Sequence, residues 1–132
     1  MTKLFINNAS LQRIRGTDTW LLLNNLFVKL ESGEEIRVPK GFITDKASVP
    51  LGWIVKRDDK YIIDGALVHD YLYSAQKIRR TFISRHHADK ILIEICKHSG
   101  MGWFKRKAVW LGVRAGGWKY WNKRADVLGN TK

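Results

Sequence analysis

The sequence predicts an α+β fold, with a small N-terminal antiparallel sheet packed on a helical region that centres on an antiparallel helix pair. Over residues 1–50, branched and aromatic residues alternate with turn-forming residues, a pattern typical of short strands. Over residues 60–124, apolar residues recur at intervals of three and four, which indicates amphipathic helices. A chain of 132 residues is expected to form a single domain, with residues 1–50 as its β-rich part.

Strands are expected throughout the N-terminal third. The apolar stretch 20–30 and the alternating stretch 35–38 flank turn-forming residues at 31–34, so they predict a hairpin. Shorter strands are expected over residues 11–15 and 41–43. The last of these should lead into a loop.

Two helices are expected to form the antiparallel pair, over residues 62–75 and 85–98. Ser84 is a suitable N-cap for the second helix, and Gly100 a suitable residue just past its end. The connection over 76–80 is short, which favours an antiparallel arrangement of the two helices.

A third helix is expected over residues 103–123, interrupted at the adjacent glycines 116–117. Each glycine costs about 1 kcal/mol in a helix relative to alanine. Trp103 and Trp110 are seven residues apart and should lie on one face, where they are expected to close the core. The tryptophans that follow the glycines are better suited to a surface role.

Polar side chains interrupt the apolar face of the helix expected over 62–75. With about 3.6 residues per turn, His69 and Tyr73 share that face and should point inward, with Asp70 at its edge. On the second helix, Asp89 lies at the edge of the apolar stripe and can face the first helix. A histidine between carboxylates is suited to orienting an imidazole or to holding a metal.

Three sequence blocks carry a resemblance. They are Gly-Phe-x-Thr-Asp-x-Ala-Ser-x-Pro at 41–50, His-Asp-x-Leu-Tyr at 69–73 and Arg-x-x-Ala-Asp at 85–89. In this order they resemble a small family of phage and prophage proteins of unassigned function, over residues 35–121. The resemblance implies a bacteriophage origin, a place in the host cytoplasm or the virion, and phage structural proteins as partners. It brings no established activity with it.

A more distant resemblance carries chemistry. The His-Asp-x-x-Tyr pattern on one helix, with Ala-Asp on the next, is similar to secreted and parvoviral phospholipases A2. That resemblance implies that His69 is the general base for an attacking water and Asp70 a calcium ligand. It also implies that Asp89 and Tyr73 orient the imidazole ring. These roles are chemically coherent, because a histidine base needs a fixed tautomer and a carboxylate to stabilise its protonated form.

The calcium-binding part of that pattern is incomplete. The Tyr-x-Gly-x-Gly loop of those phospholipases is missing, so its carbonyl ligands have no counterpart here. The loop over residues 41–50, with Asp45 and Ser48, is the available substitute. We therefore expect Asp70 and Asp45 to be the ligands of any Ca²⁺ ion, since carboxylate oxygens suit that cation.

The charge of the chain favours polyanionic partners. There are 24 Lys and Arg residues against 12 Asp and Glu, a net charge of +12. Such an excess favours anionic lipid, nucleic acid or acidic cell-wall polymers. The residues expected to bind a polyanion are Lys105, Arg106, Lys107, Lys119, Lys123 and Arg124. The start of the chain lacks the apolar core of a signal peptide, and no stretch reaches membrane-spanning length.

Two classes of function are consistent with these features. The first is a phage-encoded hydrolase that acts on an ester or related bond of the cell envelope. The second is a non-enzymatic virion component, such as a tail or capsid accessory protein, whose histidine and carboxylates form a buried network. In that case the basic surface binds nucleic acid or a protein partner.

Overall fold

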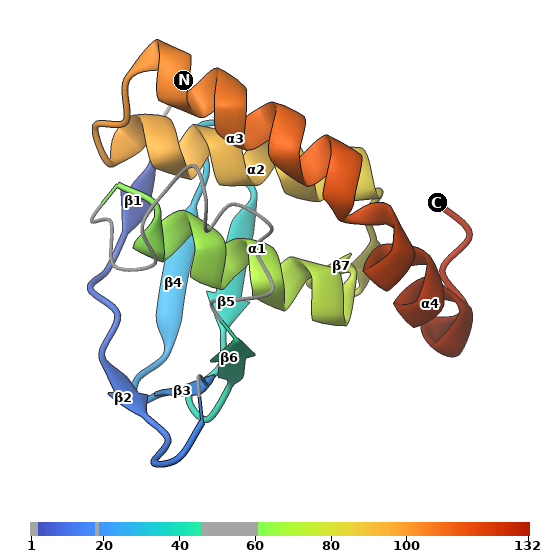
Figure 1. Cartoon of the computed structure of the whole chain (residues 1–132), viewed down its shortest axis with the longest axis horizontal. Helices are drawn as coiled ribbons and strands as arrows, with labels where there is room; N and C mark the ends of the chain where they lie inside the picture. Colours follow the sequence, from blue (N-terminus) through green and yellow to red (C-terminus); the bar gives the residue numbers. More distant parts are fainter. Residues whose placement is uncertain (1–2, 18, 46–60) are drawn as a thin grey trace.

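The computed structural model describes residues 3–17, 19–45 and 61–132, except for the side chain of Asp45, and confirms the α+β class (Figure 1). The helices are α1 (Ile63–Ala75), α2 (Arg85–His98), α3 (Trp103–Gly116) and α4 (Trp118–Leu128). The strands are β1 (Phe5–Ile6), β2 (Leu11–Arg13), β3 (Thr19–Leu22), β4 (Leu26–Lys29), β5 (Glu35–Val38), β6 (Ile43–Asp45), β7 (Lys77–Ile78) and β8 (Thr81–Phe82).

The described strands form two antiparallel three-stranded sheets, ordered β1-β4-β5 and β2-β3-β6, and the small hairpin β7-β8. The hairpin predicted around residues 31–34 is confirmed, with Leu26 opposite Val38 and Val28 opposite Ile36. These four side chains are buried while their neighbours along each strand are exposed, so one face of the sheet packs on the core.

The expectation of one strand over residues 20–30 is wrong. The stretch divides into β3 and β4, which belong to different sheets. The side chain of Asn24 accepts from Ser10 N at 2.8 Å and donates to Asn8 O at 2.9 Å, and Asn25 Oδ1 accepts from Lys40 N at 2.8 Å. These amides satisfy backbone groups that a sheet ladder would otherwise bond, so the chain can cross from one sheet to the other.

Helices α1 and α2 pack closely and antiparallel. Near the start of α1, Gly65 lies against Leu92 and Cys96, whereas Tyr73 near its end reaches Asp89, closer to the start of α2. A Cβ atom on Gly65 would lie 3.0 Å from Leu92 Cδ1, so the absent side chain sets the helix separation. The predicted cap is present, since Ser84 Oγ accepts from His87 N at 3.1 Å.

Two groups of buried side chains hold these layers together. The larger one lies between the strands, α1, α2 and α4, and includes Leu26, Leu72 and Ile95. The smaller one joins α2 to α3 and includes Leu92 and Val109. In Figure 1, α1 crosses in front of β4 and β5, and α2 and α3 follow beside it.

The predicted break at residues 116–117 is present and separates α3 from α4. The expectation that Trp103 and Trp110 close the core is wrong, because Trp103 is 69% exposed and Trp110 is half-buried. Both line a groove between α2, α3 and the β4–β5 turn. Helix α3 packs mainly on α2, so it buries only a narrow stripe with Val109 and Val113. No described helix has the length and apolarity needed to span a membrane.

We predict that Gly65→Val destabilises the protein by about 1–3 kcal/mol, because the new methyl groups would overlap with Leu92 and force α1 away from α2. Urea unfolding followed by circular dichroism measures this loss. Ala115→Val on the exposed side of α3 is the matched control for helix propensity and should cost under about 1 kcal/mol. Equal losses in the two variants would contradict the packing role of Gly65.

Candidate functional site

A buried carboxylate joins the first two helices. Asp89 of α2 is 0% exposed, and its Oδ1 atom lies 2.7 Å from Nε2 of His69 on α1. The hydroxyl group of Tyr73, one turn further along α1, donates to the same oxygen at 2.6 Å. The structure thus brings together the three residues that the sequence places on the facing sides of two helices.

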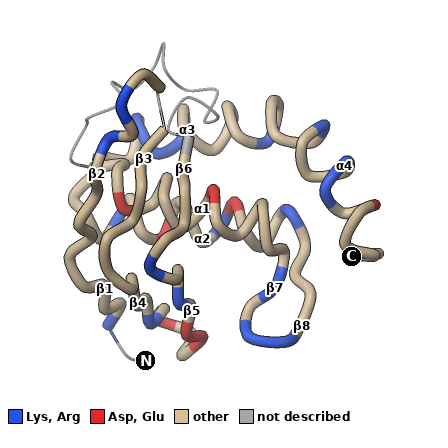
Figure 2. Tube along the Cα trace, turned by 90° about the horizontal axis from the view of Figure 1, so that it is seen from below, with Lys and Arg blue, Asp and Glu red and all other residues tan. Residues whose placement is uncertain are grey.

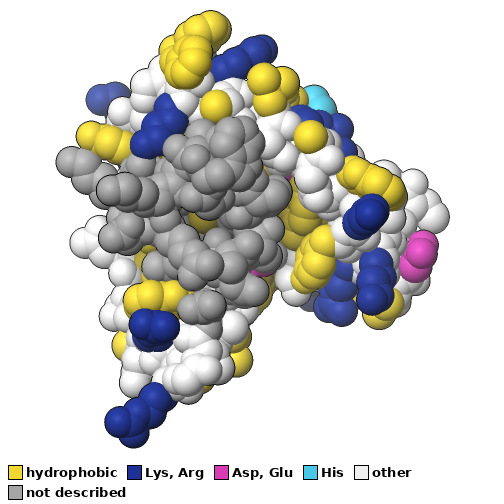
Figure 3. All heavy atoms as spheres, in the orientation of Figure 1, with side chains coloured by type: hydrophobic (Ala, Val, Ile, Leu, Met, Phe, Trp, Pro, Cys, Tyr) yellow, Lys and Arg dark blue, Asp and Glu magenta, His cyan; other side chains and the backbone are white. Residues whose placement is uncertain are grey.

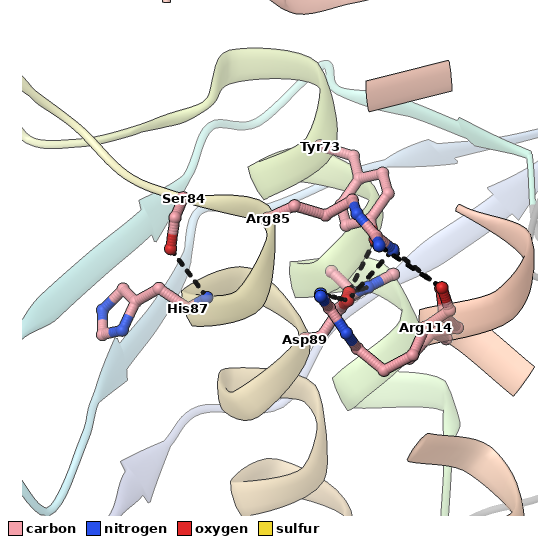
Figure 4. Close-up of polar contacts among 8 residues, drawn as sticks. Tyr73, Ser84, Arg85, His87, Asp89 and Arg114 are labelled. Carbon is pink, nitrogen blue, oxygen red and sulfur yellow. Dashed lines mark hydrogen bonds and ion pairs between the residues drawn. The ribbon is translucent and has the colours of Figure 1, made fainter. Parts of the chain in front are cut away.

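Two guanidinium groups bind the other carboxylate oxygen. Nη1 of Arg114 on α3 donates to Asp89 Oδ2 at 2.8 Å, and Nη1 of Arg85 on α2 lies 3.5 Å from it. Arg85 also donates to the carbonyl groups of Val113 and Arg114 at 3.1 and 3.3 Å. Figure 4 shows both arginines converging on Asp89 from α2 and α3, with Tyr73 beside them. One carboxylate therefore ties three helices together.

The contacts of Asp89 decide its protonation state. Burial alone would raise its pKa, but the hydrogen bonds from His69, Tyr73 and Arg114 outweigh burial and lower the pKa below its ordinary value, and the charge of His69 adds to this whenever the ring is protonated. Burial and the hydrogen bond to the Asp89 carboxylate raise the pKa of Tyr73. At neutral pH the site therefore holds an ionised aspartate and a protonated tyrosine.

The ionised aspartate fixes the tautomer of the histidine. A carboxylate only accepts hydrogen bonds, so Nε2 of His69 carries the proton that points at Asp89. In the neutral ring the lone pair is then on Nδ1, and no hydrogen bond joins Nδ1 to any residue that the structure describes. The His69 side chain itself is buried, at 6% exposed, so the ring presents Nδ1 as its basic nitrogen within a largely enclosed position and has the Asp89 anion behind it.

Asp70 lies apart from this group, although it follows His69 in the sequence. Its Oδ2 atom accepts from Thr44 Oγ1 on β6 at 2.7 Å, and the residue is half-buried. The bond joins α1 to the sheet β2-β3-β6. The side chain of Asp45, which ends β6, and all of Ser48 lie outside the described residues.

The described donors do not by themselves form a calcium site. Within residues 3–17, 19–44 and 61–132, no group of three or more His, Cys, Asp or Glu side chains could hold a metal ion. Asp89 is already bound by two arginines, a histidine and a tyrosine, and Asp70 is bound by a threonine. We therefore assign no chemical step to a cation.

Two functional features escaped the sequence reasoning. Arg114 is on a third helix, and no local spacing relates it to Asp89. Gly117 is read from the sequence only as a helix break, but a Cβ there would lie 2.6 Å from the Tyr73 hydroxyl oxygen. The missing side chain gives Tyr73 the space from which it reaches Asp89. For Arg85, the four-residue interval to Asp89 within the Arg-x-x-Ala-Asp block was an available signal.

The basic residues of the C-terminal helices have different surroundings. Lys107, Lys119 and Lys123 are exposed, Lys105 and Arg106 are half-buried, and Arg124 donates to Ser74 O at 2.8 Å. Figure 2 shows basic residues spaced along α3 and α4 and around the β7–β8 turn. The six residues expected to bind a polyanion therefore differ in their exposure, and Arg124 already bonds within the protein.

Acid unfolding should depend on Asp89. Because its pKa is lower in the folded than in the unfolded protein, ionised Asp89 stabilises the fold above pH about 4, and this contribution is lost as the pH falls through the folded-state pKa. We predict that Asp89→Asn costs about 3 kcal/mol at pH 7, because two arginines lose their counter-ion, and that this cost shrinks toward pH 2.

Urea titrations at pH 7, 4 and 2 measure the difference in the free energy of unfolding between wild type and Asp89→Asn. Taking this difference removes the contribution of other carboxyl groups, such as Asp64, whose pKa is raised by burial. The exposed residue Asp126 on α4 supplies the control, Asp126→Asn, which should change stability little at each pH. A cost of Asp89→Asn that stays constant from pH 7 to pH 2 would contradict the charge-based account.

Comparison with known proteins places the chain in a family. No curated protein and no solved structure matches it. A family model matches residues 20–113, which include α1, α2 and most of α3, and its description is "Protein of unknown function (DUF1353)". Since the match covers more than half of the chain, this protein is a member of the DUF1353 family.

Proposed function

We propose that the protein is a hydrolase in which His69 activates a water molecule for attack on an ester of the cell envelope. The observation that carries the proposal is the 2.7 Å contact between His69 Nε2 and the fully buried Asp89 carboxylate. That contact sets the tautomer, orients the ring and would stabilise the imidazolium formed in the reaction. The resemblance to phospholipases A2 supports the same roles.

The reaction follows from the two ring nitrogens. Nδ1 of His69 takes a proton from water while the water oxygen attacks the ester carbon, and Asp89 stabilises the positive ring. The tetrahedral intermediate then breaks its bond to the alkoxide, which leaves with the proton from Nδ1. The products are a carboxylic acid and an alcohol. Tyr73 acts as a positioning residue, because its hydroxyl group binds the same oxygen of Asp89 as His69 does.

The proposed origin is a bacteriophage or prophage, and the proposed location is the host cytoplasm or the virion. The three sequence blocks at 41–50, 69–73 and 85–89 support this origin, because in that order they resemble a family of phage and prophage proteins. Mass spectrometry of purified virions, with infected-cell lysate beside them, distinguishes the two locations.

Calcium dependence is a separate proposal, since it depends on Asp70 and Asp45. Activity measured in EGTA and in millimolar Ca²⁺ tests it. We expect stimulation by Ca²⁺ that is lost in Asp70→Asn. Equal rates in both buffers would contradict a calcium-assisted reaction and leave the roles of His69 and Asp89 unchanged.

We predict that His69→Gln abolishes hydrolysis while the melting temperature stays within a few degrees of wild type. The Gln amide can still donate to Asp89, but it has no basic lone pair. The assay measures fatty-acid release from phosphatidylglycerol vesicles and p-nitrophenol release from short-chain esters. His98→Gln, at an exposed position on α2, is the control and should keep full activity.

Tyr73→Phe should lower kcat by about tenfold and leave KM unchanged, because it loosens Asp89 without removing the base. Hydrolysis by His69→Gln at the wild-type rate would rule out His69 as the base. Absence of hydrolysis by the wild type on all these substrates, together with a loss of about 1–3 kcal/mol of stability in His69→Phe, would favour a structural network.

The second candidate function is a non-enzymatic virion component. The observation that favours it is that Asp89 joins α1, α2 and α3 through four side chains, an arrangement that a purely structural network also produces. In that case the basic surface would bind nucleic acid or a phage structural protein. Recovery of the protein at a fixed copy number from purified virions, without hydrolysis, would support this alternative.

A further inference from the structure

An apolar stripe follows the outer side of α3. Phe104, Ala108, Leu111 and Ala115 recur at intervals of four, three and four, which places them on one side of the helix, and Trp118 continues the spacing at the start of α4. We call these five residues the α3 stripe. Phe104 is 82% and Leu111 58% exposed, whereas Val109 and Val113 on the opposite side are buried. The stripe therefore holds three large exposed side chains, Phe104, Leu111 and Trp118, spaced by the half-buried Ala108 and the exposed Ala115. Exposed apolar side chains that cluster on one side of a helix indicate an interaction surface.

Cations border the stripe. Lys107 is exposed one turn after Phe104, and the Lys119 ammonium lies 5.5 Å from the centre of the Trp118 ring. Helix α3 contains no acidic residue, and α4 contains one, Asp126. In the space-filling view, hydrophobic and basic side chains alternate over α3 and α4 (Figure 3). The surface is therefore both apolar and positively charged.

We propose that the α3 stripe docks the protein on the surface of a bilayer that contains anionic phospholipid. Helices that lie in the membrane interface combine Trp, Phe and Leu on one side with flanking Lys and Arg, which is the composition of this surface. The apolar side chains would enter the headgroup boundary, while Lys107 and Lys119 would contact lipid phosphates.

The composition favours lipid over the other partners of a basic surface. Nucleic acid is bound by basic and aromatic side chains on which bases stack, and the aliphatic Leu111 offers no stacking surface. A protein partner could also cover an apolar centre with a charged rim, so the test below separates that occupant from lipid. A bilayer accommodates both the mixed aliphatic and aromatic side chains of the stripe and its cationic border. This docking goes beyond the proposed hydrolysis and does not require it, so the two proposals can fail separately.

The test is co-sedimentation of the full chain with vesicles of phosphatidylcholine alone and of phosphatidylcholine mixed with an equal amount of phosphatidylglycerol. We expect binding to the anionic vesicles, a blue shift of tryptophan fluorescence, and weaker binding as salt rises. Phe104→Ser combined with Leu111→Ser should weaken binding by about tenfold or more, because their burial supplies the apolar part of the affinity. Lys107→Gln combined with Lys119→Gln should weaken it by about tenfold.

Matched controls lie on the sheet side of the molecule. Phe5→Ser with Phe27→Ser replaces two exposed aromatic residues, and Lys29→Gln with Lys40→Gln removes two exposed charges. Both control variants should bind as wild type does, and thermal melts should show all variants folded.

Three outcomes would overturn the proposal. The first is no binding of wild type to anionic vesicles at low salt. The second is unchanged binding of the Phe104 and Leu111 double variant, or an equal loss in the controls. The third is a dimer in sedimentation velocity that this double variant abolishes, which would assign the stripe to a second copy of the chain. Hydrolysis is measured separately on soluble esters, so a loss of vesicle binding leaves the chemistry at His69 testable.

Discussion

The structure depends on how it accommodates a negative charge in its interior. A buried carboxylate costs several kcal/mol in desolvation unless all its lone pairs are bonded. Asp89 meets this condition through His69 and Tyr73 on one oxygen and Arg114 and Arg85 on the other. Because these partners come from α1, α2 and α3, the charge can be satisfied only when the three helices are correctly placed. A helix arrangement that displaced these partners would leave the carboxylate uncompensated, which costs several kcal/mol.

The same contacts have two consequences that are usually separate. They hold the helices together, and they leave His69 with a defined tautomer and an anion behind its ring. Two glycines support both the helix packing and the orientation of His69, because neighbouring side chains lie close to their backbone. Gly65 lets α1 lie against Leu92, and Gly117 leaves space for the Tyr73 hydroxyl group. Positions without side chains therefore determine the geometry of the polar site as much as the polar residues do.

The parts of the fold that periodicity specifies could be predicted from the sequence. The β4–β5 hairpin, the α1–α2 pair, the Ser84 cap and the break before Trp118 all depend on neighbours close in sequence. The meeting of His69 with Asp89 was predictable because each residue lies on the inward side of its own helix.

Features set by distant segments could not be predicted in this way. The stretch 20–30 is apolar throughout, and its division depends on contacts of Asn24 and Asn25 with residues 8, 10 and 40. Arg114 joins the site only because α3 docks on α2, and the direction of that docking leaves Trp103 exposed. Periodicity identifies the faces of a helix but not which face meets its neighbour.

The crossing of the chain between sheets at Asn24 and Asn25 also has a consequence for local stability. Strands β4 and β5 bury one full face, whereas β2 and β3 expose more of their side chains and β3 pairs with β6 across a long sequence interval. The free energy of the local opening that lets a backbone amide exchange with solvent should therefore be lower in β2-β3-β6 than in β4, β5 and α2. The Thr44–Asp70 contact would then open together with the less protected sheet, whereas Asp89 would stay protected with α2.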